Sequence, residues 1–144
     1  MSLLSGQRLS RRNVLLQMAA SMMACAAPAL LRAQSPTDTQ AHPVPRKGIT
    51  GDRVASADML ARSSHLIPLF ESVRSIPQVV DGIRCHCGCA EMNGHYSLLT
   101  CYEGENAMAK ICPICQGMGR VAVRMHKDGR SLKDIREAVD AQFG

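Results

Sequence analysis

The chain contains little that would build a large apolar core. Among its 144 residues there is no tryptophan, and tyrosine and phenylalanine occur only twice each. Aromatic side chains supply much of the buried area of a small protein, so this chain supports one small domain with a modest core. Its seven cysteines offer disulfide or metal crosslinks, which small domains often need.

The sequence also lacks an uninterrupted apolar run long enough to span a membrane. Its apolar stretch from Val14 to Leu31 contains Gln17 and Ser21 and is typical of the apolar part of a signal peptide. The stretch overlaps the sequence SRRNVL, which resembles the twin-arginine export motif. We therefore predict that residues 1–33 are a signal peptide for the twin-arginine export machinery and that the mature protein is periplasmic.

The cleavage point and the fate of Cys25 stay open. We place a small-residue cleavage site after Ala33, with Ala24 or Ala27 as alternatives. The tripeptide that ends at Cys25 faintly resembles a lipobox, although the apolar stretch continues beyond it. Attachment to a membrane is expected only if Cys25 is lipidated. An unstructured or amphipathic N-terminus is the simpler alternative.

An excess of positive charge is missing from the rest of the chain. Seventeen basic residues stand against twelve acidic ones, but four of the arginines and none of the acids lie in residues 1–33. Residues 34–144 therefore keep thirteen basic and twelve acidic residues, a net charge of +1. Nucleic-acid binding needs a basic surface on the folded domain, so we predict no nucleic-acid partner.

Motifs of the common enzyme classes are absent from the sequence. We find no nucleophile triad, no paired-carboxylate pattern and no phosphate-binding loop. The segment Gly117-Met118-Gly119 follows no predicted strand, as a dinucleotide-binding loop would. Its glycines instead let a helix approach a neighbour closely. The sequence does not indicate an enzyme.

Helical patterns begin in the middle of the chain. Residues 34–55 hold three prolines among small polar residues and predict a flexible linker. Residues 56–144 show apolar residues at steps of three and four, which predicts a small all-α domain. Pro68 predicts a break between two short helices, and another short helix is expected between Pro77 and Gly82.

The last two helices have clear boundary signals. Pro113 predicts a helix start with Cys112 near the N-cap, and Gly129 predicts its end. Ser131 and Asp134 form a capping-box pattern at the start of the final helix. The segment before these helices shows no strand pattern, so we expect a cysteine-rich loop held between helices.

The cysteines after Cys25 have a spacing that gathers sulfur atoms. Three alternate along one short segment, with Gly88 supplying backbone freedom, and two form a C-x-x-C motif at a predicted helix start. The six are Cys85, Cys87, Cys89, Cys101, Cys112 and Cys115. Neighbouring cysteines close only tiny disulfide loops, which stabilise little. A metal ion, in contrast, gathers thiolates that cannot pair with one another.

These thiols predict a site for a thiophilic metal ion. Thiolates select Cu(I), Zn(II) or iron–sulfur clusters, and nearby methionine thioethers favour Cu(I), although such methionines more often fill a core. The methionines are Met92, Met108, Met118 and Met125. We assign all six cysteines as ligands, with His95 as an additional candidate ligand and His86 as a further one. Binding, storage or transfer of the ion would involve a protein that donates or accepts it.

Two other interpretations stay open. Cys112 and Cys115 form a candidate redox pair, because a helix dipole favours a thiolate at the helix N-terminus. The sequence shows neither the strand nor the βαβ surround of a thioredoxin-type motif. Alternatively, disulfides formed in an oxidising compartment would staple the domain as a structural or interaction module.

The combined pattern resembles the exported CYCXC family of cysteine-rich proteins, also called PCYCGC-motif proteins, some of which are described as lipoproteins or selenoproteins. The resemblance covers residues 77–144 and includes the tail DGRSLKDIREAVDAQFG. The matching positions are Cys85, Cys87, Gly88, Cys89, Gly94, His95, Cys101, Cys112 and Cys115. His86 stands where the family usually has tyrosine, and Arg84 where it has proline. The resemblance implies a metal or redox role and no particular reaction.

Overall fold

The computed structural model describes the chain from residue 41 to residue 144, except for the side chains of Cys89 and Ala90. The predicted signal peptide, residues 1–33, lies outside the described residues. The first part of the predicted linker does so as well. All described residues fall in one structural unit.

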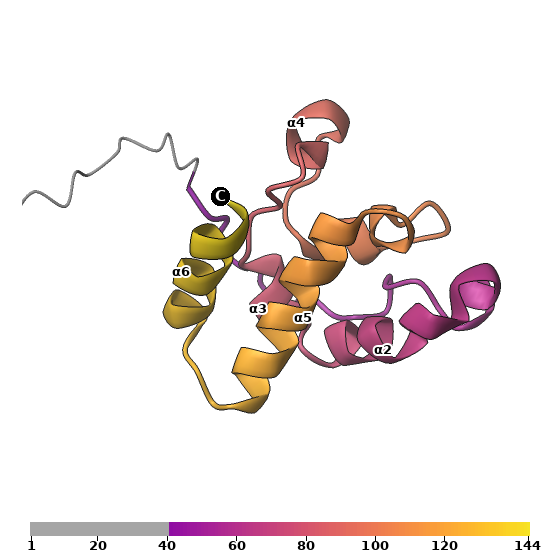
Figure 1. The fold of residues 1–144 in the computed structure, drawn as a ribbon, viewed down its shortest axis with the longest axis horizontal. Helices are drawn as coiled ribbons and strands as arrows, with labels where there is room; N and C mark the ends of the chain where they lie inside the picture. Colours follow the sequence, from indigo (N-terminus) through magenta and orange to yellow (C-terminus); the bar gives the residue numbers. More distant parts are fainter. Residues whose placement is uncertain (1–40) are drawn as a thin grey trace, which may run out of the picture. The chain divides into compact units, whose positions relative to one another are not determined.

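The described residues are mainly helical and form no β-sheet (Figure 1). Their elements are the 3₁₀ helix η1 (Asp58–Leu66), α2 (Ile67–Ser75), α3 (Pro77–Asp81), α4 (Cys89–Asn93), the 3₁₀ helices η2 (Leu99–Tyr102) and η3 (Met108–Lys110), α5 (Pro113–Lys127) and α6 (Leu132–Phe143). The predicted all-α class is confirmed. Within these residues, no helix is long and apolar enough to cross a lipid bilayer.

Proline and glycine set several of the helix boundaries. Pro68 lies in the first turn of α2, where a backbone N–H would have no partner within the helix. Helix η1 ends at Leu66, just before α2 begins. Pro77 likewise opens α3, and Gly82 follows its last residue. These boundaries lie where the sequence predicts them.

Helices α5 and α6 also begin at the predicted residues. Cys112 is the N-cap of α5, and Pro113 is its first residue. At the start of α6, the Asp134 N–H donates to Ser131 Oγ at 3.2 Å, and the Ser131 N–H donates to the Asp134 carboxylate at 3.3 Å. The predicted capping box is therefore closed in both directions.

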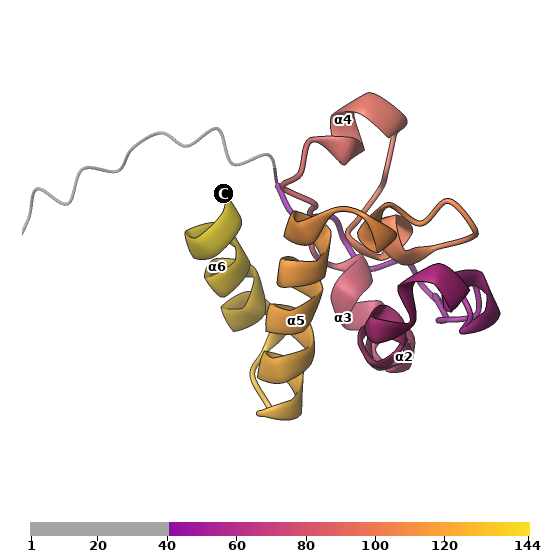
Figure 2. The same ribbon diagram turned by 45° about the vertical axis from the view of Figure 1, so that its right-hand side comes forward.

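Helix α5 is the central element of the core. It packs against α6, α2 and α3, and Figure 2 shows it between α6 on one side and α2 with α3 on the other. Met118 and Ala122 of α5, Phe70 of α2 and Ile135 of α6 are wholly buried. This packing fixes the direction of α5 and so the place of the C-x-x-C motif in its first turn.

Residues 41–55 lie against the helices, in the second part of the predicted linker. Val54 and Ala55 are buried, and the Ala55 N–H donates to the Tyr102 carbonyl at 2.9 Å. Single contacts of this kind hold the segment in place. The segment has no repeating apolar pattern, so its packing could not be predicted from the sequence. The packed domain therefore begins before the predicted boundary at residue 56.

A buried carboxylate joins this segment to α3. The side chain of Asp81 is 0% exposed and accepts hydrogen bonds from Arg46 Nη2 at 2.7 Å and from the Arg46 N–H at 2.8 Å. Ser97 Oγ donates to the same carboxylate at 2.7 Å. Burial alone would raise the pKa of Asp81, but the hydrogen bonds from Arg46 and Ser97 hold this pKa below its usual range.

We predict that Asp81→Asn lowers the free energy of unfolding by about 2–3 kcal/mol at neutral pH, because Arg46 and Ser97 lose a charged acceptor. The effect stays below that of a fully buried pair, since the Arg46 side chain is 37% exposed. Denaturant unfolding measures it.

The same carboxylate predicts a pH dependence. Because its pKa is lowered by folding, its contribution is complete above the unfolded-state pKa of about 4 and is lost as the pH falls below that value. Between about pH 6 and about pH 3 the Asn variant should therefore lose less stability than the parent. Equal losses would show that Asp81 is not the group responsible.

Candidate metal centre

Three separate segments bring cysteines to one place. Cys85 and Cys87 lie in the loop that follows α3, and Cys101 lies in η2. Cys112 and Cys115 lie at the start of α5. Because these segments meet only in the folded chain, the site depends on the packing of α3, η2 and α5.

The loop that carries Cys85 is closed at its base and extended by a short helix. The Leu98 N–H donates to the Ile83 carbonyl at 2.7 Å. Helix α4, which the sequence does not predict, lies between Gly88 and Gly94, and both glycines have left-handed backbone conformations, with φ of 77° and 64°. Figures 1 and 2 show α4 standing away from the other helices.

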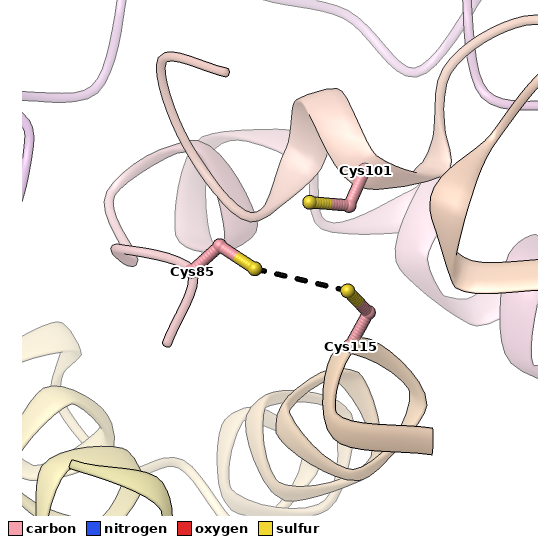
Figure 3. Close-up of side chains that lie close together, drawn as sticks. All are labelled: Cys85, Cys101 and Cys115. Atoms are coloured by element: carbon pink, nitrogen blue, oxygen red, sulfur yellow. Dashed lines mark hydrogen bonds between the residues drawn. The ribbon is translucent and has the colours of Figure 1, made fainter. Parts of the chain in front are cut away.

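The sulfur atoms of five cysteines lie close together and form two groups. The inner group is Cys85, Cys101 and Cys115, and the outer group is Cys87, Cys112 and Cys115; within each group all Sγ atoms lie within 4.8 Å of one another. Figure 3 shows the inner group, in which the three sulfur atoms face a common point. We call these five residues the cysteine cluster.

Three short distances join the sulfur atoms of Cys85, Cys87 and Cys115. Cys85 Sγ lies 3.7 Å from Cys115 Sγ and 3.1 Å from Cys87 Sγ, and the Cys87 and Cys115 sulfur atoms are 3.5 Å apart. A disulfide bond would need about 2.05 Å, and none of the five cysteines is bonded to another of them. Among the described side chains, the disulfide-stapled alternative therefore finds no support.

The predicted cysteines differ in exposure. The side chains of the inner group are all buried, whereas Cys87 and Cys112 are only partly buried. The side chain of Cys89, the sixth predicted ligand, lies outside the described residues. The cluster thus has one side in the core and one side toward the surface.

The inner group shares its protons unevenly. Hydrogen bonding by Cys101 and Cys115 lowers the pKa of Cys85 far below its usual value, and hydrogen bonding with Cys101 and Cys85 raises the pKa of Cys115. These hydrogen bonds favour a thiolate at Cys85 over one at Cys115. Since a metal ion needs deprotonated ligands, its binding would displace the remaining protons.

His95 lies at the edge of the cluster. Its Nδ1 is 3.4 Å from Cys101 Sγ, which is a hydrogen-bonding distance to sulfur, and it belongs to neither group. In this position His95 donates to a cluster sulfur or accepts from it. Orientation of a ligand sulfur by such a contact is typical of the residues around metal sites.

His86 faces α6 and also belongs to neither group. Its Nε2 lies 2.9 Å from the Asp140 carboxylate, and its side chain is only 8% exposed. His42 Nε2 lies 3.1 Å from the same carboxylate, and His42 Nδ1 accepts a hydrogen bond from the Arg84 N–H at 3.0 Å. These contacts hold the cysteine loop against α6.

No pattern in the sequence indicates a role for His42 or Asp140. Both lie far along the chain from His86, and neither is part of a motif. Only the folded chain brings the three side chains together. Each of them contacts backbone or another side chain of this network, and together they position the loop.

Tyr102 supports the cluster from the core side. Its hydroxyl donates to the Cys115 carbonyl at 2.7 Å, and burial raises the pKa of Tyr102 far above its usual range, so the hydroxyl stays protonated. A Cβ at Gly119 would collide with this hydroxyl and lie 2.9 Å from Cζ of the same ring. As the sequence predicts, glycine lets α5 approach a neighbour, and that neighbour is Tyr102.

Comparison with known proteins identifies one family. A protein-family model described as "Protein of unknown function with PCYCGC motif" matches residues 14–144. The comparisons with curated proteins and with solved structures gave no significant match.

We predict opposite outcomes for alanine at the two glycines of α5. Each substitution gains about 1 kcal/mol of helix propensity. Gly119→Ala pushes into Tyr102, which is buried and hydrogen-bonded, and should lower the free energy of unfolding by about 1–3 kcal/mol despite that gain. Denaturant unfolding measures the change.

Gly117→Ala is the matched control on the same helix. Its Cβ would meet only the ring end of Phe143, at 2.8 Å. This ring lies on the last residue of α6 and is partly exposed, so it can move aside. Gly117→Ala should therefore be near neutral. If Gly119→Ala proves as stable as Gly117→Ala, Tyr102 does not fix α5.

Proposed function

The chain belongs to the family of PCYCGC-motif proteins, whose function is unknown, and we propose that it binds Cu(I) through its cysteine cluster. The observation that carries the proposal is the convergence of five described sulfur atoms from three segments into two groups with spacings of at most 4.8 Å. None of these sulfur atoms is joined to another by a disulfide, so covalent crosslinks between them do not account for the convergence.

The spacings suit sulfur atoms around a single metal ion. Two thiolates bound to a tetrahedral ion at about 2.3 Å lie about 3.8 Å apart. The distances of 3.5 and 3.7 Å from Cys115 Sγ to Cys87 Sγ and Cys85 Sγ are close to that value. The residues present therefore fit an ion with little movement of the backbone.

The number of ligands favours Cu(I) over the other thiophilic ions. Each group offers three sulfur atoms, whereas structural Zn(II) sites are almost always four-coordinate. A [4Fe–4S] cluster places four cysteines on four iron atoms, and a [2Fe–2S] cluster divides four cysteines into two pairs, whereas the described sulfur atoms gather in groups of three. Cu(I), a soft ion, is satisfied by two or three thiolates.

The role we propose is handling of the ion by storage or transfer, without a catalysed reaction. Cys87 and Cys112 are partly exposed, so a thiol of a donor or acceptor protein would reach an ion held there. The twin-arginine motif in the predicted signal peptide supports export to the periplasm. Membrane attachment through Cys25 remains the alternative location that the sequence suggests.

We predict that Cu(I), added without oxygen to the reduced protein at about 1,000 times its dissociation constant, raises the melting temperature by more than about 10 °C. Scanning calorimetry measures the shift. Cys115→Ser should lose most of it, because both groups contain Cys115. Met92→Leu is the control and should keep the full shift, since Met92 is 77% exposed. A parent protein that takes up no copper would rule the proposal out.

The location has its own test. Replacement of both Arg11 and Arg12 by lysine should retain the protein in the cytoplasm, because the paired arginines are the part of the motif that the twin-arginine machinery reads. Cell fractionation followed by immunoblotting measures it. Export of the double-lysine protein at the parental level would exclude the twin-arginine route.

A redox role is the second candidate, and one observation favours it. Cys112 is partly exposed at the N-cap of α5, while Cys115, three residues later, is buried. This places an accessible thiol and a protected one within 4.8 Å. In that role Cys85 and Cys101 would be dispensable, so serine at both positions would leave thiol–disulfide exchange with a disulfide substrate intact. Binding of an ion by the inner group requires both.

A further inference from the structure

Cys115 is the hub of the cysteine cluster. It is the member that the inner and outer groups share, and its sulfur also forms a third triangle with those of Cys85 and Cys87, with sides of 3.1, 3.5 and 3.7 Å. The five sulfur atoms are therefore arranged as three adjoining triangles around one atom. The triangle of Cys85, Cys87 and Cys115 is the central one. Cys101 belongs to the triangle on one side of it, and Cys112 to the triangle on the other side.

One Cu(I) ion does not use all five sulfur atoms, because two or three thiolates satisfy it. The inner group, the outer group and the triangle of Cys85, Cys87 and Cys115 each bring three sulfur atoms within 4.8 Å of one another. A single ion in the central triangle would leave Cys101 and Cys112 unused, although the fold brings both to the cluster.

We infer that the cysteine cluster binds two Cu(I) ions that share the sulfur of Cys115 as a bridging ligand. The inner ion is held by Cys85, Cys101 and Cys115, and the outer ion by Cys87, Cys112 and Cys115. This inference rests on the proposed function and adds the number of ions and the role of each sulfur. With five sulfur atoms, each ion obtains three ligands only if one sulfur is shared.

The surroundings of Cys115 suit a bridging ligand. Its carbonyl is fixed by the Tyr102 hydroxyl at 2.7 Å, and its side chain is 0% exposed. It lies in the first turn of α5, a helix that packs against α6, α2 and α3. The sulfur is therefore held still and shielded from water.

The two ions would differ in access. The inner group is wholly buried, whereas two of the three residues of the outer group are partly exposed. A Cu(I) chelator in solution should therefore withdraw the outer ion first and the inner ion more slowly. This asymmetry assigns exchange with a partner protein to the outer ion.

The test counts copper ions in the full-length reduced chain and its serine variants by native mass spectrometry after anaerobic loading with Cu(I). The parent should bind two ions, and Cys101→Ser and Cys112→Ser should each bind one. Cys112→Ser is expected to fold well, because serine is a preferred N-cap residue. Cys25→Ser, in the predicted signal peptide, is the matched control and should still bind two.

The shared sulfur is tested by X-ray absorption at the copper edge. The parent should show copper–copper scattering, and Cys112→Ser should lose it together with one ion. Chelator competition should withdraw copper from the parent in two phases and leave only the slow phase in Cys112→Ser.

The outcomes separate the inference from the proposed function. One ion in the parent, kept by both Cys101→Ser and Cys112→Ser, would overturn the two-ion cluster and leave copper binding intact. Two ions without copper–copper scattering would overturn the shared sulfur. A parent chain without copper would overturn both the inference and the proposed function.

Discussion

The hydrogen bond from the Tyr102 hydroxyl to the Cys115 carbonyl joins the core of this protein to its cysteine cluster. The Tyr102 ring packs edge-on against Phe70, with centroids 4.8 Å apart, and the Tyr102 carbonyl accepts from the Ala55 N–H. One residue therefore connects α2, η2, α5 and the N-terminal segment. Gly119 lets α5 lie directly on this ring. The position of Cys115 is therefore set by the packing of α5 on Tyr102.

A small core explains why the site is placed at the meeting point of these elements. The chain has four aromatic residues besides histidine and no tryptophan, so apolar burial alone leaves a narrow margin of stability. An ion bound by cysteines from three segments would crosslink the loop, η2 and α5. Metal binding would then contribute directly to folding, as it does in other small metal-binding domains.

Local signals in the sequence were sufficient for much of the fold. Pro68, Pro77 and Pro113 mark helix starts, and Ser131 with Asp134 marks another, because these residues act through backbone groups within one helical turn. The cysteine spacing likewise indicated a gathering of sulfur atoms. Residues 41–55 and the contact of His42 with Asp140 left no such mark, since they depend on pairings between distant parts of the chain that no local pattern records.

The sequence also could not predict that Cys115 belongs to both groups of the cluster, and the reason is geometric. The C-x-x-C spacing shows only that Cys112 and Cys115 lie on one turn of a helix. Which of the two faces inward depends on how α5 is rotated about its axis, and that rotation is set by Tyr102, Gly119 and the contact with α6. Turned as it is, α5 buries Cys115 among the other sulfur atoms and leaves Cys112 toward the surface. The division of the cluster into a protected and an accessible side therefore follows from the packing of α5. The proposed difference between a retained ion and an exchangeable ion depends on the same packing.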